Sequence, residues 1–266
     1  MTEMSLTLGG GPLAADAPKT VNYTVESPRH SLFMEPFPRR VRAEIGGRTV
    51  LDSERGYLVH ETHLLPVLYV PEEDIRQGML QPSDHTTHCP YKGDATYRHV
   101  KVGERVVENA VWSYPQPKDE AYWLRGLASL YWDAADAWFD EAERVYGHLP
   151  DPYHRVDTRR SHTIVRVSVG DQVLALSANP VVLSETGLPN RYYLPPSDVR
   201  RELLTPSTTR TYCPYKGGAC YFNIRVGDRE IADAAWTIPH PLQEGQDVRD
   251  HYCFLHDEVT IDLEKA

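Results

Sequence analysis

The ten-residue segment HCPYKGDATY, residues 88–97, determines how this sequence is organised, because a close copy of it occurs later in the chain. The copy is YCPYKGGACY, residues 212–221, at an offset of 124 residues. With the same offset and no gap, about 25 of the 57 positions from 61 to 117 are identical. A period this long is far beyond that of solenoid repeats, so the sequence predicts a duplicated domain.

The repeat also indicates where each domain begins and ends. The same offset aligns Arg42 with Arg166 and Asp133 with Asp257. We therefore expect a first domain at 38–140 and a second at 162–266, joined by a linker at 141–161 that is rich in charge, Pro and His. Residues 1–37 are expected to form an N-terminal arm.

Each copy predicts a mostly β domain with one short helix. Residues 41–45 alternate between apolar and polar side chains before a Gly-Gly turn, which is typical of a hairpin. Pro71 and the acidic residues after it predict a short helix ending near Leu80, with a counterpart from Pro195 to Leu204. In the later strand of the second copy, alternation assigns these side chains to the core face: Cys220, Phe222, Ile224 and Val226.

Composition narrows the classes of partner. The 266 residues are 41% hydrophobic and carry a net charge of -10. Because an acidic surface repels phosphate backbones, we expect no nucleic-acid partner. No apolar run approaches the ~20 residues that span a bilayer, and the N-terminus lacks the pattern of a secretion signal. We therefore expect a cytoplasmic protein that does not bind membranes.

The cysteines do not predict a metal site. None of the four belongs to a C-x-x-C pair, and Cys220 and Cys253 have no equivalent in the first copy. His85, His88 and Cys89 have the spacing of metal ligands, but the second copy lacks both histidines. We expect no metal, no cofactor and reduced thiols.

Duplicated copies drift apart, so a polar residue that both copies retain was under constraint in each of them. Such residues are the candidates for a functional site. The catalytic candidates are Cys89, Cys213, Glu61 and Glu185. The candidate ligand-binding residues are Glu61, Tyr69, Tyr91, Lys92 and Trp112, with the second-copy equivalents Glu185, Tyr193, Tyr215, Lys216 and Trp236.

The repeated Cys-Pro-Tyr-Lys-Gly turn has three interpretations. Pro and Gly fix a turn that would present the lysine ammonium beside an aromatic ring at a binding site. The turn would instead be a scaffold if the cysteine packs as a small apolar residue and the lysine pairs with a glutamate. A nearby cation would also lower the pKa of the thiol and make it a nucleophile.

The retained glutamate and tryptophan each have two interpretations. Glu61 and Glu185 end an apolar strand and would either orient the lysine or act as a general base. Trp112 and Trp236 precede a Pro-x-Pro segment and would either stack on a ligand or anchor the core.

The pattern Thr-x-Cys-Pro-Tyr-Lys-Gly-x-Ala-x-Tyr, followed by Ala-x-Trp and Pro-x-Pro, resembles the signature of the uncharacterised family numbered 427 among the domains of unknown function. Glu61 and the upstream Tyr69-x-Pro71-x-x-Asp74 fit the same signature, and the resemblance covers nearly the whole chain as a tandem pair. It implies a β-tent-like, Mss4-related fold with a pocket between two sheets. The zinc-ligating C-x-x-C pairs of relatives with that architecture are missing here.

The resulting hypothesis is that each domain binds a small anionic or carbonyl-bearing molecule in a pocket lined by aromatic, Lys and Glu side chains. One alternative is a thiol-dependent enzyme that uses Cys89 and Cys213, although the copies share no second cysteine for a dithiol cycle. The other alternative is a non-catalytic protein-interaction module.

Overall fold

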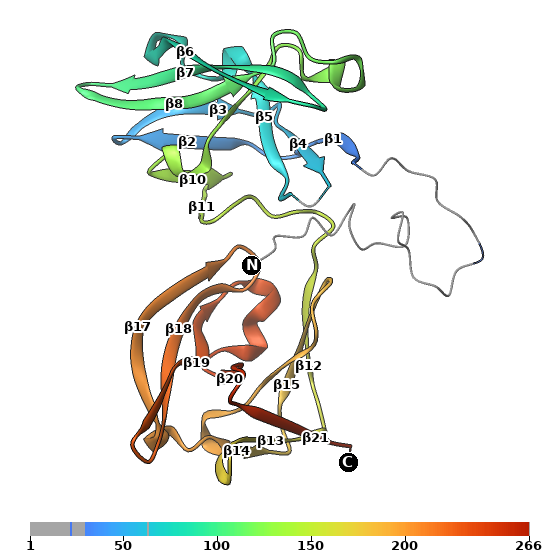
Figure 1. Cartoon of the computed structure of the whole chain (residues 1–266), viewed down its shortest axis with the longest axis vertical. Helices are drawn as coiled ribbons and strands as arrows, with labels where there is room; N and C mark the ends of the chain where they lie inside the picture. The colour runs from blue at the N-terminus through green and yellow to red at the C-terminus, as the bar shows by residue number, and fades with distance from the viewer. Residues whose placement is uncertain (1–21, 23–29, 63, 266) are drawn as a thin grey trace. The chain divides into compact units, whose positions relative to one another are not determined.

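The computed structural model describes Asn22, residues 30–62 and residues 64–265, and the chain divides into two compact units. The first unit ends at Asp151 and the second comprises Pro152–Ala266 (Figure 1). Most of the arm expected at 1–37 lies outside the described residues. Within the described part of the chain, no helix is both long and apolar enough to cross a lipid bilayer.

The described part of the first unit contains two antiparallel sheets (Figure 1). One sheet has seven strands in the order β1-β4-β5-β9-β8-β7-β6, and the other has four in the order β11-β10-β2-β3. The strands are β1 (Leu32–Pro36), β2 (Val41–Ile45), β3 (Arg48–Ser53), β4 (Tyr57–Glu61), β5 (Val67–Pro71), β6 (Leu80–Cys89), β7 (Gly93–Val102), β8 (Arg105–Ser113), β9 (Leu127–Leu130), β10 (Ala137–Asp140) and β11 (Glu143–Val145).

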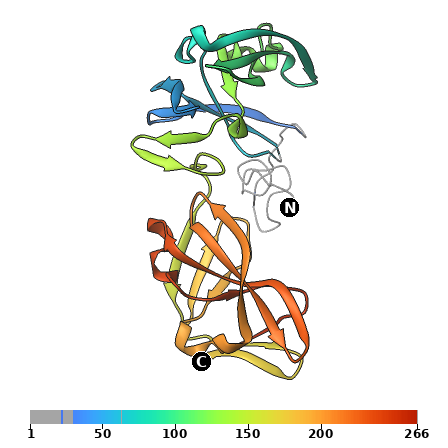
Figure 2. The ribbon, with the colours of Figure 1, turned by 90° about the vertical axis from the view of Figure 1, so that its left-hand side faces the viewer.

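The second unit, yellow to red in Figure 2, contains three antiparallel sheets within its described residues. Their strand orders are β12-β15-β16, β14-β13-β21 and β17-β18-β19-β20. The strands are β12 (Val156–Arg160), β13 (Ile164–Val169), β14 (Gln172–Ser177), β15 (Val181–Glu185), β16 (Arg191–Tyr193), β17 (Leu204–Cys213), β18 (Gly217–Val226), β19 (Arg229–Pro241), β20 (Cys253–Phe254) and β21 (Thr260–Glu264).

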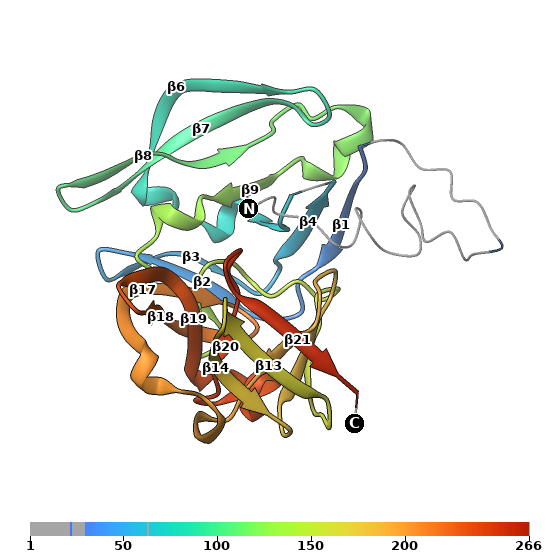
Figure 3. The same cartoon turned by 60° about the horizontal axis from the view of Figure 1, so that its bottom comes forward.

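Strand pairing repeats between the units with the offset found in the sequence. The hairpin of β6 and β7, which lie side by side in Figures 1 and 3, corresponds residue for residue to that of β17 and β18. Val70 pairs with Ala128 where β5 meets β9, and the equivalent residues Leu194 and Tyr252 form an isolated bridge. The duplicated sequence therefore folds twice in one mostly β pattern, as predicted.

Three strands, β1, β11 and β12, lie in segments for which the sequence predicted none. Strand β1 lies within the span expected for the arm and pairs with β4, and β12 lies within the span expected for the linker and pairs with β15. Only Val156 and Thr158 of β12 are buried, and the strand otherwise carries charged residues. In β1, Leu32 and Met34 pack against the core, and the equivalent residues of β12, Val156 and Thr158, are buried, so the alternation is present but spans only a few residues.

The short helix expected after Pro71 is present as two 3₁₀ turns, η1 (Glu72–Asp74) and η2 (Gln77–Met79). Between them Ile75 forms a bridge with Leu51, which returns the backbone to an extended conformation and prevents a continuous helix. The other 3₁₀ segments are η3 (Asp119–Leu124), η4 (Trp132–Ala134), η5 (Pro196–Asp198), η6 (Arg201–Leu203) and η7 (Gln243–Val248).

Each unit buries a larger, mainly aliphatic cluster and a smaller cluster built around tyrosine side chains. In the first unit the larger cluster includes Val41, Ile45 and Leu51, whereas the smaller one is built around Tyr69 and Tyr97. The second unit repeats the division, and its smaller cluster is built around Tyr193. The candidate site residues Tyr69 and Tyr193 pack in these smaller clusters.

Cys220 is half-buried and does not lie fully in the core, contrary to the expectation from alternation. The register between β18 and β19 shifts between Gly218 and Cys220, and again between Phe222 and Ile224. Each shift interrupts the two-residue alternation of side chains. As a result Ala219 and Ile224 are both buried, although strict alternation would place an odd-numbered and an even-numbered residue on opposite faces.

Candidate functional site

The repeated turn joins two long strands in each unit, and a glycine allows it to form. Gly93 has φ of +103° and Gly217 has φ of +100°, a conformation that other residues rarely adopt. A Cβ atom at Gly93 would lie 3.2 Å from Gln116 O, and one at Gly217 would lie 2.8 Å from His240 O. The turn therefore packs directly against the segment that contains the repeated Pro-x-Pro.

That segment also holds the backbone of the site lysine. The Lys92 carbonyl accepts a hydrogen bond from Lys118 N at 3.1 Å, and the Lys216 carbonyl accepts one from Leu242 N at 3.1 Å. In the first unit the Lys118 ammonium also donates to the Pro90 carbonyl. The backbone that carries each site lysine is therefore hydrogen-bonded to the neighbouring segment.

The retained lysine and glutamate form an ion pair in both units. Lys92 Nζ donates to Glu61 Oε2, and Lys216 Nζ donates to Glu185 Oε2. The exposed fractions of the side chains are 12% for Lys92 and 10% for Glu61. A pair this well shielded from water is energetically coupled more strongly than a surface pair.

A histidine that the sequence analysis did not identify completes each site. His30 Nε2 donates to Glu61 Oε1 at 2.8 Å, and His154 Nε2 donates to Glu185 Oε1 at 3.0 Å. The two histidines are themselves 124 residues apart, so this signal was present in the sequence. Each unit therefore contains a His–Glu–Lys chain in which both carboxylate oxygens are occupied.

The histidine rings also cover the tyrosine of the turn. His30 stacks on Tyr91 with 3.6 Å between ring centroids and 8° between ring planes. His154 stacks on Tyr215 at 4.2 Å and 28°. Tyr91 is exposed on its other side and Tyr215 is half-buried, so these rings form the outer edge of each site.

Strand pairing explains why histidine and glutamate meet. Glu61 ends β4 and lies opposite Leu32 at the start of β1, which places His30 two residues beyond the pairing. Ser31 N donates to Thr62 Oγ1 at 2.8 Å, and Thr62 N donates to the Ser31 carbonyl at 3.2 Å. The second unit repeats both bonds between Arg155 and Thr186.

The electrostatics of the second site favour an ionised carboxylate. Burial alone would raise the pKa of the Glu185 carboxyl. Hydrogen bonds from His154 and Lys216, together with the charge of Lys216, outweigh burial and hold this pKa below its ordinary value. The glutamate can therefore neutralise the lysine and fix the orientation of its ammonium.

The retained Tyr–Trp pairs lie beneath the sites. Trp112 Nε1 donates to Tyr69 Oη at 3.0 Å, and Trp236 Nε1 donates to Tyr193 Oη at 3.1 Å. Tyr69 and Tyr193 are 2% and 1% exposed, and burial raises the pKa of both phenols. They support the sites from the interior, and the half-buried tryptophans lie between them and the surface.

The cysteines of the turn are half-buried. Cys89 packs against the aromatic cluster that contains Tyr69 and Tyr114, where burial raises the pKa of the Tyr114 phenol. The two sites differ at position 114. In the first unit Lys92 Nζ lies 5.9 Å from the centroid of the Tyr114 ring, whereas the second unit has Ile238 at the position equivalent to Tyr114. The His–Glu–Lys chain is thus retained although the side chain beneath it has changed.

A hollow opens beside the first site, and it offers space for a ligand. Its volume is about 620 Å³, and Pro90 and Tyr91 of the turn line it together with Lys118, Asp119 and Glu120. Among the residues that the structure describes, no group of three or more His, Cys, Asp or Glu side chains is arranged to hold a metal ion.

Comparison with known proteins gives the family of the chain. A search of curated proteins found no match. The family model described as "Domain of unknown function (DUF427)" matches residues 33–141 and again residues 157–265. Both matches begin three residues after a site histidine, at the same offset as the structural repeat. The chain therefore belongs to the DUF427 family and contains two tandem copies of its domain.

Proposed function

We propose that each unit binds a small molecule through a carbonyl or carboxylate oxygen, with Lys92 and Lys216 as the donors. The observation that carries this proposal is the recurrence of the His–Glu–Lys chain, atom for atom, in both units. A pair needed only for stability is often replaced by packed apolar residues without loss, so double retention favours a shared binding role.

The free donors of the lysine support this choice of ligand. An ammonium has three N–H donors. Among the described residues, Glu61 alone accepts from Lys92 Nζ, and Glu185 alone accepts from Lys216 Nζ. The remaining donors can bind an acceptor oxygen. Because the glutamate already balances the lysine charge, the site suits a polarised carbonyl as well as an anion.

The other retained residues have supporting roles in this proposal. Glu61 orients the Lys92 ammonium, and His30 occupies the second carboxylate oxygen. The ring of Tyr91 borders the 620 Å³ hollow and provides a flat apolar surface for the ligand. The proposal includes a β-tent architecture for each unit, supported by antiparallel sheets with only short 3₁₀ turns between their strands in the described residues.

Packing favours binding over thiol chemistry. Cys89 lies against apolar and aromatic side chains, as expected of a small buried hydrophobe. The copies share only this one cysteine position, since Cys220 and Cys253 are unmatched. All four cysteines are free, which supports a reducing compartment such as the cytoplasm as part of the proposal.

A ligand screen tests the proposal. Small ketones, amides and carboxylates are added to the full chain, and stabilisation is measured by thermal unfolding. We expect a stabilising compound to bind at two sites per chain, with one lost in Lys92→Met and the other in Lys216→Met. Lys265→Met, at an exposed lysine, is the control and should bind normally. Unchanged binding in the Lys92→Met/Lys216→Met protein would exclude the lysines from the site.

A further inference from the structure

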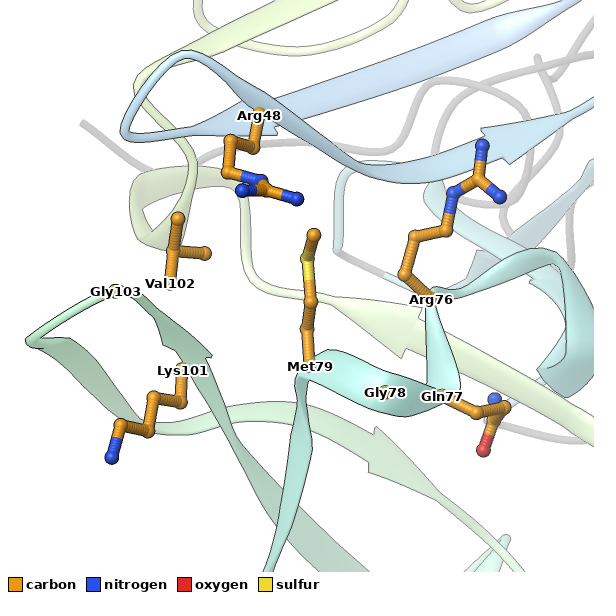
Figure 4. A pocket seen from close by; sticks show the side chains of 8 residues that line it. All are labelled: Arg48, Arg76, Gln77, Gly78, Met79, Lys101, Val102 and Gly103. Atoms are coloured by element: carbon orange, nitrogen blue, oxygen red, sulfur yellow. The ribbon is translucent and has the colours of Figure 1, made fainter.

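A second hollow of the first unit lies away from the His–Glu–Lys residues. Its volume is about 590 Å³ (Figure 4). Arg48 at the start of β3 contributes to it, followed by Arg76 and the 3₁₀ turn η2, and then by residues 101–103 where β7 turns into β8. None of its lining residues belongs to the site described above.

The lining is strongly positive although the whole chain carries a net charge of -10. Arg48, Arg76 and Lys101 line the hollow, and no carboxylate does. Figure 4 shows the guanidinium groups of Arg48 and Arg76 on either side of the tip of Met79, whereas the Lys101 ammonium extends away from them. Both arginines border the same hollow, and the lysine adds positive charge at its rim.

These three cations have no carboxylate partner within 4.0 Å in the described part of the chain. The charge of Arg76 acts on the Asp52 carboxylate, but Asp52 already accepts two hydrogen bonds of 2.7 Å from Arg40. The Arg40 hydrogen bond is the main reason that the pKa of Asp52 is lowered, and Arg76 has a smaller effect. Two unpaired guanidinium groups beside one hollow favour an anionic occupant.

The second unit provides a natural comparison. The residue equivalent to Arg76 is Arg200, whose Nε donates to Glu202 Oε1 at 2.9 Å. The residue equivalent to Glu202 is Gly78, and a Cβ atom there would contact nothing within 4 Å. Arg48 is replaced by Gln172. The second unit therefore supplies its own carboxylate, whereas the first has an additional arginine and open space.

We propose that the first unit binds a small phosphorylated compound in this hollow, with its phosphate held by Arg48 and Arg76. Guanidinium groups bind phosphate oxygens in pairs, and a phosphate monoester carries more negative charge than a carboxylate near pH 7. Met79 provides an apolar surface for the organic part of the compound. The site is independent of the binding proposed at Lys92 and Lys216.

Calorimetric titration of the full chain with phenyl phosphate tests this site. We expect saturable binding at one site per chain, weakened at least tenfold in Arg48→Gln, which reproduces the residue of the second unit. Gly78→Glu should weaken binding as much, because its carboxylate would occupy the hollow. The position has room for the side chain and lacks a left-handed backbone, so this variant should fold.

Two controls separate charge from size and position. Gly78→Gln adds nearly the same bulk without charge and should bind more tightly than Gly78→Glu. Gln243→Glu adds the same charge at an exposed position of the second unit and should bind like the unmodified protein. The proposal is overturned if the binding of phenyl phosphate does not saturate, or if Gly78→Glu and Arg48→Gln bind phenyl phosphate as tightly as the unmodified protein. It is also overturned if phenyl phosphate binds no more tightly than benzoate.

Discussion

The imidazole of His30 lies parallel to the ring of Tyr91, with centroids 3.6 Å apart, while its Nε2 donates to Glu61 Oε1. One side chain thus connects the start of β1, the end of β4 and the repeated turn. The equivalent contacts of His154 connect β12, β15 and the second turn. The segment before each family match is therefore part of the site.

Substitution of His30 separates stacking from hydrogen bonding. His30→Phe keeps a flat ring but loses the bond to Glu61, whereas His30→Ala loses both contacts. We expect His30→Ala to lower the free energy of unfolding by about 1–3 kcal/mol, and His30→Phe to recover part of this loss. Urea unfolding of the full chain measures both values. Equal losses in the two variants would show that stacking on Tyr91 contributes nothing.

A double-mutant cycle measures the buried ion pair. Removing one partner leaves the other charge poorly solvated, so Glu61→Gln and Lys92→Met should each lower the free energy of unfolding by about 3 kcal/mol. The double variant should lose at least about 1 kcal/mol less than the sum of the two, because it leaves no unpaired charge. Strict additivity in urea unfolding would mean that the two side chains are not coupled.

The lowered pKa of Glu185 predicts a loss of stability in acid. The folded state binds a proton to this carboxylate less readily than the unfolded state, whose pKa is about 4.3. Its stabilising contribution is therefore complete above that pH and is lost as the pH falls through the folded pKa. Glu185→Gln should be less stable than the unmodified protein at pH 7, with the difference shrinking toward pH 3.

The control for this pH dependence is Glu202→Gln. Its carboxylate also has a lowered pKa, because Arg200 donates a hydrogen bond to it, but the pair is exposed to solvent. Exposed pairs contribute little, so this variant should change the acid dependence less than Glu185→Gln does. A larger effect at Glu202 would contradict the role assigned to the His–Glu–Lys chain.

The turn glycines should tolerate substitution poorly. A Cβ atom at Gly217 would meet the His240 carbonyl at 2.8 Å, so Gly217→Ala combines a close contact with a disfavoured backbone conformation. We expect it to lower the free energy of unfolding by about 3 kcal/mol. Gly227 also has positive φ but open space around it, and Gly227→Ala should lower it by about 1 kcal/mol. Similar losses would show that the contact with His240 is easily relieved.

Much of each site could be predicted from sequence because the duplication retained its side chains. Glu61 was given two possible roles, orienting Lys92 or acting as a general base, and the two side chains form an ion pair. Tyr91 lies at the same site, stacked on the histidine. Trp112 was given two possible roles, and its bond to the buried Tyr69 associates it with the interior.

His30 was not predicted, because the expected first domain began at residue 38. Its offset to His154 is the same as that of the rest of the repeat, and Pro28 and Pro152 precede the two histidines in the same way. The residues that follow differ between the copies, for example Phe33 and Asp157. β1 and β12 are sheet-edge strands whose core-facing positions carry different residues in the two copies, Leu32 and Met34 against Val156 and Thr158, so identity fades there.

Other details depend on contacts between distant segments and have no local signal. The bridge between Leu51 and Ile75 divides the expected helix into two turns, although the Pro and acidic residues favoured one. The register shifts between β18 and β19 similarly decide that Ala219, not Cys220, is buried. Such features follow from how whole strands pair, and periodicity in one segment does not contain that information.

The hydrogen bond from Lys118 N to the Lys92 carbonyl braces the repeated turn of the first unit. Because the turn is braced and Gly93 leaves no room behind it, the lysine can adjust only by rotating its side chain. In the binding proposed at Lys92, the turn would therefore be ordered before the ligand arrives, and little entropy would be lost in ordering it. A site of this kind would select its ligand by shape, because the braced backbone would not rearrange to fit a different one.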